Sequence, residues 1–180
     1  VDELIAQLTL EEKALLCVGR DFWTTRPVDR LGIPSIWLAD GPTGVRKAQR
    51  STEPGIGTSL PATCFPTASA LAASWDTALV WEVGQAIAVE AQAQGVQILL
   101  GPGVNLKRSP LGGRNFEYFS EEPVLSGELA AAFVAGAQSQ GVGACLKHFV
   151  ANENETGRMY ADSIVDERTL REVYLLPFEI

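Results

Sequence analysis

Histidine and cysteine are scarce in this chain, which argues against whole classes of site. His148 is the only histidine, and no pair of the three cysteines has the spacing of metal ligands, so we expect no metal site. Cys17, Cys64 and Cys145 are odd in number, and each lies in or beside an apolar run. We therefore predict that all three cysteines are small buried hydrophobic residues.

Positive charge and long apolar runs are also lacking. The chain has 14 Lys and Arg against 22 Asp and Glu, a net charge of −8, and so lacks the basic footprint of a nucleic-acid-binding protein. No apolar run approaches the ~20 residues of a membrane span. The first residues have neither the basic nor the apolar region of a signal peptide, which slightly favours a cytoplasmic over a secreted location. The acidic balance suits a small neutral polar ligand better than a polyanion.

What the chain does contain is an alternation of short apolar runs and helical patterns. A capping box, Thr9-x-x-Glu12, predicts a helix that stops at Gly19. Further helices are expected after a cap at Ser74 or Asp76, over 124–140 and from about 167, and buried strands over 36–39, 96–100 and 143–150. Residues 43–67 are expected to form a long loop. This order predicts an α/β fold with parallel strands, either a doubly wound sheet or a (β/α)₈ barrel of which about three β-α units are present.

Polar side chains cluster where the predicted strands end. Asp40 follows the first strand, Lys147 and His148 interrupt the third, and Arg114 lies in the segment after the second. The carboxyl ends of barrel strands are where barrels build their active sites. Two alternatives remain open at this point: Asp40 could be a turn former that caps its own backbone, and His148 a hydrogen-bonded core residue beside a Lys147 that reaches the surface.

The chain stops at residues 175–180 within an apolar, helix-like pattern that has no cap. We therefore expect it to be the first part of a longer protein. Residues 1–35 would form an N-terminal helix and lead-in, and residues 36–180 the first β-α units.

Four blocks together resemble the N-terminal barrel domain of family 3 glycoside hydrolases of the bacterial β-glucosidase type. They are DGPTGVR (40–46), RSPLGGRNFEYFSEEP (108–123), LKHFVANENETGR (146–158) and ERTLREVYLLPFE (167–179), and they occur in the family's order. The resemblance covers nearly the whole chain and implies an exo-acting retaining β-glycosidase that hydrolyses the non-reducing terminal sugar. It implies a small carbohydrate or glycoside as the ligand, no cofactor, and no nucleic-acid or membrane partner.

The resemblance also implies roles for single positions. Asp40 resembles the carboxylate that accepts hydrogen bonds from sugar hydroxyls, while Arg114, Lys147 and His148 resemble the cluster that donates to the others. Arg46 and Arg158 match positions that carry arginine in the bacterial branch. Glu117 and Glu121 resemble internal partners of arginines rather than catalytic groups.

No catalytic residue is assigned within this chain. In resembling proteins the nucleophile is an Asp on a later strand and the acid/base is a Glu in a second domain, so both are expected beyond residue 180. The chain reads KHFVANE where the β-N-acetylglucosaminidase branch reads KHFPGHG, and this difference favours the glucosidase type. A catalytically silent carbohydrate-binding module is the first alternative. A β-xylosidase, or a glycosidase acting on glycosylated small molecules, is the second.

Overall fold

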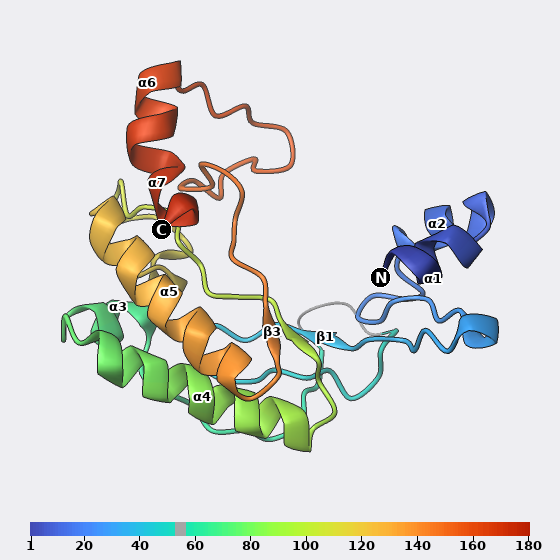
Figure 1. The fold of residues 1–180 in the computed structure, drawn as a ribbon. Helices are drawn as coiled ribbons and strands as arrows, with labels where there is room; N and C mark the ends of the chain where they lie inside the picture. Colours follow the sequence, from blue (N-terminus) through green and yellow to red (C-terminus); the bar gives the residue numbers. More distant parts are fainter. Residues whose placement is uncertain (53–56) are drawn as a thin grey trace.

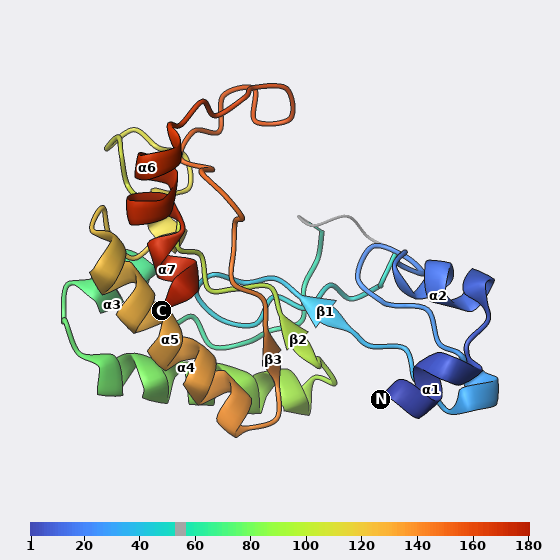
Figure 2. The same ribbon diagram turned by 45° about the horizontal axis from the view of Figure 1, so that its top comes forward.

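The computed structural model describes residues 1–52 and 57–180, so part of the predicted 43–67 loop lies outside the described residues. Three short strands, β1 (Leu38–Ala39), β2 (Ile98–Leu99) and β3 (Gly143–Ala144), form a parallel sheet in the order β1-β2-β3. Leu38 pairs with Ile98 and Ile98 with Gly143, so the three strands are in step (Figure 2). Each consecutive pair is joined by a helical crossover, as the alternation of apolar runs and helices predicts.

Two long helices cover one face of this sheet. Asp76 caps α4 (Thr77–Ala93) by accepting from the amide of Leu79 at 3.0 Å, and α5 (Pro123–Ser139) begins with a proline at its first position. The two helices lie side by side beneath the strands (Figure 1). Their buried apolar side chains form the core with those of the sheet, including Leu99, Val80, Ile87, Leu129 and Val142.

Glycines let α4 and α5 approach closely. A Cβ atom on Gly84 would lie 2.4 Å from the carbonyl oxygen of Phe133, and one on Gly136 would lie 2.1 Å from that of Trp81. Real Cβ atoms do not approach backbone this closely, so both positions require glycine at the present helix spacing.

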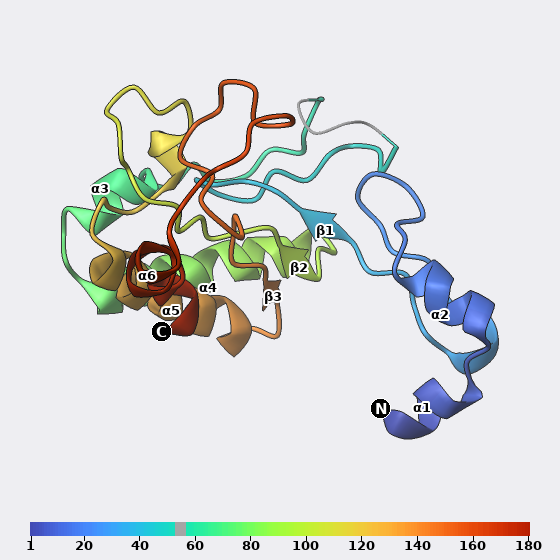
Figure 3. The same cartoon turned by 90° about the horizontal axis from the view of Figure 1, so that it is seen from above.

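The N-terminal segment lies at the end of the molecule opposite α3 (Ala68–Ala72) (Figures 1 and 3). Here α1 (Asp2–Gln7), which the sequence patterns did not predict, precedes α2 (Leu10–Leu16). The predicted capping box is present: Thr9 accepts from the amide of Glu12 at 3.2 Å, and Glu12 accepts from that of Thr9 at 2.8 Å. Although α2 forms as expected, it ends before Gly19 and none of its residues is buried.

The last segment is helical from Glu167 onward, as predicted. It comprises α6 (Glu167–Thr169), a π-helical turn η3 (Leu170–Tyr174) and α7 (Leu176–Glu179). Two short 3₁₀ helices, η1 (Asp29–Leu31) and η2 (Asn115–Glu117), complete the described elements.

The structure departs from the sequence expectations in further ways. The strands are shorter than predicted, and the third ends at Ala144, so Phe149 lies in a turn and is exposed. The short helix α3 follows the predicted loop without having been foreseen; Thr67 caps it by accepting from the amide of Ala70. Cys17, Cys64 and Cys145 are all exposed rather than buried.

The cysteine error has a physical cause in each case. The helix that precedes Cys17 buries none of its residues, and Cys64 lies in the irregular segment before α3. Cys145 follows β3, which has a neighbour on only one side in the described sheet. An apolar run alone therefore does not establish burial.

Candidate functional site

Side chains from all three strand ends meet around one open cavity of about 520 Å³. Its lining contains every residue selected from the sequence: Asp40, Arg46, Arg114, Lys147, His148 and Arg158. Phe22, Trp23, Leu100 and Cys145 complete the wall. The structure thus brings together residues that are more than a hundred positions apart in the chain.

Backbone pairing that continues past the strands explains this convergence. Lys147 donates its amide to the carbonyl of Pro102 at 3.0 Å and accepts at its own carbonyl from the amide of Val104 at 2.7 Å. The segment after β3 is therefore held against the segment after β2. Lys147 thus remains at the edge of the sheet although it is no longer within a strand.

Asp40 lies between two cations. Its Oδ1 accepts from Lys147 Nζ at 2.8 Å and its Oδ2 from Arg46 at 3.0 Å. Burial alone would raise the pKa of Asp40, but the hydrogen bond and charge of Lys147, the Gly41 amide and Arg46 hold that pKa below its usual value. The hydrogen bond from the Gly41 amide is the backbone contact expected if Asp40 were a turn former, and Asp40 forms it together with both ion pairs. Asp40 is accordingly an anion and a hydrogen-bond acceptor.

Glu117 lies between Arg114 and Lys147 and so connects Arg114 to the Lys147–Asp40 pair. Its side chain is only 4% exposed and pairs with Arg114 Nε, while its other oxygen lies 3.8 Å from Lys147 Nζ. The predicted role as an internal partner of arginine therefore fits Glu117. Glu121 is exposed and forms no ion pair with an arginine among the described residues, so the same prediction is wrong for it.

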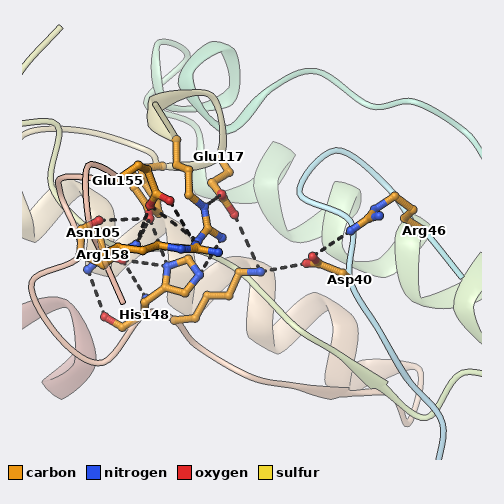
Figure 4. A network of polar contacts seen from close by, with 11 residues as sticks. Asp40, Arg46, Asn105, Glu117, His148, Glu155 and Arg158 are labelled. Atoms are coloured by element: carbon orange, nitrogen blue, oxygen red, sulfur yellow. Dashed lines mark hydrogen bonds and ion pairs between the residues drawn. The ribbon is translucent and has the colours of Figure 1, made fainter. Parts of the chain in front are cut away.

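Glu155, which the sequence reasoning missed, extends the cluster to Arg158. It lies 3.1 Å from Arg158 and 3.8 Å from Arg114. The charges alternate in sign along the whole cluster (Figure 4), in the order Arg46, Asp40, Lys147, Glu117, Arg114, Glu155, Arg158. Four cations against three carboxylates leave a net charge of +1. The available signal was that Glu155 lies only three residues before Arg158, so the two opposite charges are close along the chain.

His148 lies inside this cluster as a neutral group. Burial, and then the charges of Arg114, Lys147 and Arg158, lower the pKa of His148 to about 4. The Nε2 atom of His148 lies 2.7 Å from Arg114. Arg114 can only donate, so Nε2 accepts in this contact, and the role of His148 toward sugar hydroxyls stays a prediction. The Lys147–His148 peptide bond is cis.

Two aromatic residues outside the predicted set form one wall of the cavity. The rings of Phe22 and Trp23 meet edge to face at a centroid distance of 5.1 Å, and Phe22 is 59% exposed. Asp21 fixes this loop by accepting from the amide of Trp23 at 3.1 Å and the hydroxyl of Ser51 at 2.7 Å. An adjacent aromatic pair in a loop was a signal that the sequence reasoning left unused.

Among residues 1–52 and 57–180, no group of three or more His, Cys, Asp or Glu side chains is arranged to hold a metal ion. Within the same residues, no helix combines the length and apolar character needed to cross a membrane.

Comparison with known proteins gives a consistent set of relatives. Residues 11–180 match the model of the glycosyl hydrolase family 3 N terminal domain. The chain is 63% identical to thermostable beta-glucosidase B of Acetivibrio thermocellus, over 99% of this chain and 24% of that protein. It is 50% identical to an exo-alpha-(1->6)-L-arabinopyranosidase of Bifidobacterium longum, over 97% of this chain and 23% of that enzyme.

The fold comparison agrees. The structure of beta-glucosidase 3B from Thermotoga neapolitana in complex with alpha-D-glucose matches with a TM-score of 0.90 at 48% identity, over 99% of this chain and 27% of that one. The expected fold class, the N-terminal part of a (β/α)₈ barrel, is confirmed. The chain spans about a quarter of the length of the relatives it matches.

Proposed function

Since the chain belongs to glycosyl hydrolase family 3, we propose that it supplies the sugar-binding half of the active site of an exo-acting retaining β-glycosidase, a β-glucosidase. The observation that carries this proposal is the cavity lined by all six selected residues. Residues 36–180 would form the first β-α units of the catalytic barrel, and residues 1–35 the lead-in to it.

The chemistry of the cluster suits a neutral sugar. Each sugar hydroxyl both donates and accepts a hydrogen bond, and the cavity presents the carboxylate of Asp40 beside donors such as Lys147 and Arg158. Hydrogen bonds to charged groups are the stronger kind. Because the charges of the cluster nearly cancel, its side chains can form strong hydrogen bonds to a neutral ligand without attracting a counterion.

Selectivity follows from the same arrangement. A sugar hydroxyl that separates Asp40 from Lys147 must satisfy both, because a buried polar group left unpaired costs about 1–3 kcal/mol. An epimer whose hydroxyl points elsewhere leaves the pair desolvated and incompletely bonded. The pocket thereby discriminates between sugars through the geometry of a few charged groups.

The carboxylates of this charged cluster serve binding rather than catalysis. A retaining enzyme needs two carboxyl groups about 5–5.5 Å apart, one as nucleophile and one as proton donor. Asp40, Glu117 and Glu155 each lie within 4 Å of a cation, and the lowered pKa of Asp40 keeps it from donating a proton. We infer that nucleophile and acid/base come from the part of the enzyme that this chain does not span. This chain's residues would bind the terminal sugar, fix its orientation and exclude water from its hydroxyls.

For the identity of the sugar there are alternatives to glucose. The relative from Bifidobacterium longum is named for an arabinopyranoside, so a pocket of this family also serves other pyranoses. A β-xylosidase or a glycosidase of glycosylated small molecules is therefore the second candidate. A catalytically silent binding module with the same pocket is the third.

The test is turnover by the full-length parent protein against p-nitrophenyl β-glucoside, β-xyloside and α-L-arabinopyranoside, beside the isolated 180-residue chain. We expect the highest kcat/KM on the glucoside for the parent and no turnover by the isolated chain. Preference for another glycoside would support the second candidate. Glucose binding without turnover of any substrate would support the silent module, and turnover by the isolated chain would overturn the assignment of catalysis outside it.

A further inference from the structure

Asn105 holds His148 at three points. Its Oδ1 accepts from the backbone amide of His148 at 2.9 Å and lies 3.0 Å from the ring atom Nδ1. Its Nδ2 donates to the carbonyl of His148 at 3.0 Å (Figure 4). Asn105 is only 2% exposed, and it lies in the segment after β2 that pairs with the segment after β3.

These contacts fix which end of the Asn105 amide is the oxygen. A backbone N–H can only donate and a backbone carbonyl can only accept. The atom facing the His148 amide must therefore be Oδ1, and the atom facing the His148 carbonyl must be Nδ2. The orientation of this side chain follows from its two backbone partners and requires no assumption about the ring.

The orientation of Asn105 determines the tautomer of His148. Oδ1 can only accept, so Nδ1 of His148 must carry a proton to bond with it. On the other side of the ring, the Arg114 guanidinium can only donate, and it lies 2.7 Å from Nε2. Nε2 must then be unprotonated. Both contacts agree on one form, the neutral ring with its proton on Nδ1.

The charges around the ring favour the same neutral form. Arg114, Lys147 and Arg158 disfavour a charged imidazole, and together with burial they outweigh the opposing charge of Asp40. The hydroxyl oxygen of Tyr118 also lies 3.1 Å from Nδ1, and it can accept from an Nδ1–H because a hydroxyl both donates and accepts. Burial raises the pKa of Tyr118 to about 12, and its hydroxyl already donates to the carbonyl of Asn152 at 3.3 Å.

We propose that Asn105 is a positioning residue that selects the Nδ1–H tautomer of His148, so that Nε2 accepts from Arg114 and fixes the guanidinium for sugar binding. Arg114 is held by Glu117 at Nε and by His148 at a terminal nitrogen, which leaves its remaining N–H groups for the ligand. The opposite tautomer would set Nε2–H against an Arg114 N–H, two donors face to face. The effect on sugar binding rests on the proposed function, whereas the tautomer of His148 is a property of the chain itself.

The kinetic test compares Asn105→Asp with Asn154→Asp in the full-length parent. Both changes add one negative charge, but Asn154 is exposed and its side chain accepts from the Thr156 amide, away from His148. A carboxylate against Nδ1 keeps that nitrogen protonated but favours the charged ring, in which Nε2–H faces Arg114. An opposite charge at this range moves a pKa by about 1–3 pH units.

We therefore expect the acid limb of the kcat/KM profile of Asn105→Asp to move up by about 1 pH unit or more. The profile of Asn154→Asp should not move. If Asn105 only supported the fold, the fraction of active enzyme would fall and the limb would stay in place. An unmoved limb, or equal shifts in both variants, would overturn the proposal.

A spectroscopic measurement on the unaltered parent keeps the proposal testable if Asn105→Asp does not fold. Histidine labelled with ¹⁵N reports which ring nitrogen carries the proton, and His148→Gln identifies the signal of His148. Protonated Nδ1 with bare Nε2 near neutral pH supports the proposal, and protonated Nε2 overturns it. This measurement needs no turnover, so an inactive parent would refute the proposed function while the tautomer would still be decided.

Discussion

Replacing Glu117 with glutamine removes the charge that separates two cations in the pocket. The Glu117 side chain is 4% exposed, and its partners Arg114 and Lys147 are 20% and 15% exposed at their side chains. Glutamine has nearly the same shape and keeps one oxygen acceptor. The change therefore tests the charge more than the packing.

The expected loss of stability depends on the partners that Arg114 and Lys147 keep after the substitution. Removing one partner of a buried ion pair costs about 3–5 kcal/mol, because the other charge stays desolvated. Lys147 retains Asp40 at 2.8 Å, whereas Arg114 retains the carboxylate of Glu155 at 3.8 Å and the neutral contact with His148 at 2.7 Å. Solvent also reaches both cations to some extent. We therefore expect Glu117→Gln to lower the free energy of unfolding by about 2–3 kcal/mol.

The binding function should change with it. In Glu117→Gln the guanidinium of Arg114 loses the charge of its partner at Nε, so its donors are less firmly held for a ligand. A loss of about 1.4 kcal/mol in ligand binding would raise KM about tenfold. Urea denaturation followed by tryptophan fluorescence and KM for p-nitrophenyl β-glucoside, both on the full-length parent, measure the two effects.

The matched control lies four residues away on the same segment. Glu121→Gln makes the same chemical change at an exposed position and should alter the unfolding free energy by no more than about 0.5 kcal/mol. Equal effects of the two substitutions, or an unchanged KM in Glu117→Gln, would show that the buried carboxylate does not organise the cations.

Further outcomes follow from other parts of the structure. Lys147→Ala and His148→Ala in the parent should each raise KM and lower kcat together, whereas Lys13→Ala, an exposed lysine, should change neither; wild-type kinetics would remove the first two from the pocket. The unfolded chain binds protons at His148 near pH 6.5 and the folded chain only near pH 4, so stability should fall as pH drops from about 6.5 to 4. This pKa difference corresponds to ~3 kcal/mol of unfolding free energy, which solvent screening at the partly exposed ring reduces to about 1–2 kcal/mol. His148→Gln should flatten the pH dependence in urea titrations. Gly84→Ala, with a Cβ 2.4 Å from the Phe133 carbonyl, should force α4 and α5 apart and cost about 1–3 kcal/mol, so an unchanged urea midpoint would contradict the close helix contact.

Local chemistry determined a large part of this protein. The capping box at Thr9, the cap at Asp76 and the apolar runs predicted α2, α4 and the alternation of strands and helices along the chain, because these signals act between residues close in sequence. The motif blocks predicted the family, and all the residues selected from them line one cavity. Parallel strands place their carboxyl ends at one edge, which is why residues as distant as Asp40 and Lys147 could be expected to meet.

Tertiary structure alone decided which partner each side chain has. Glu117 is buried and Glu121 exposed although both follow Arg114 closely, because burial depends on the direction of the chain after η2. The three cysteines lie in or beside apolar runs and are nonetheless exposed, since neighbouring elements rather than local hydropathy determine burial. The ring nitrogens of His148 face Asn105 Oδ1 and the guanidinium of Arg114, two partners from segments distant in sequence that the residues around His148 could not reveal. A hydrogen bond depends on both of its partners, and the sequence near His148 contains only one of them.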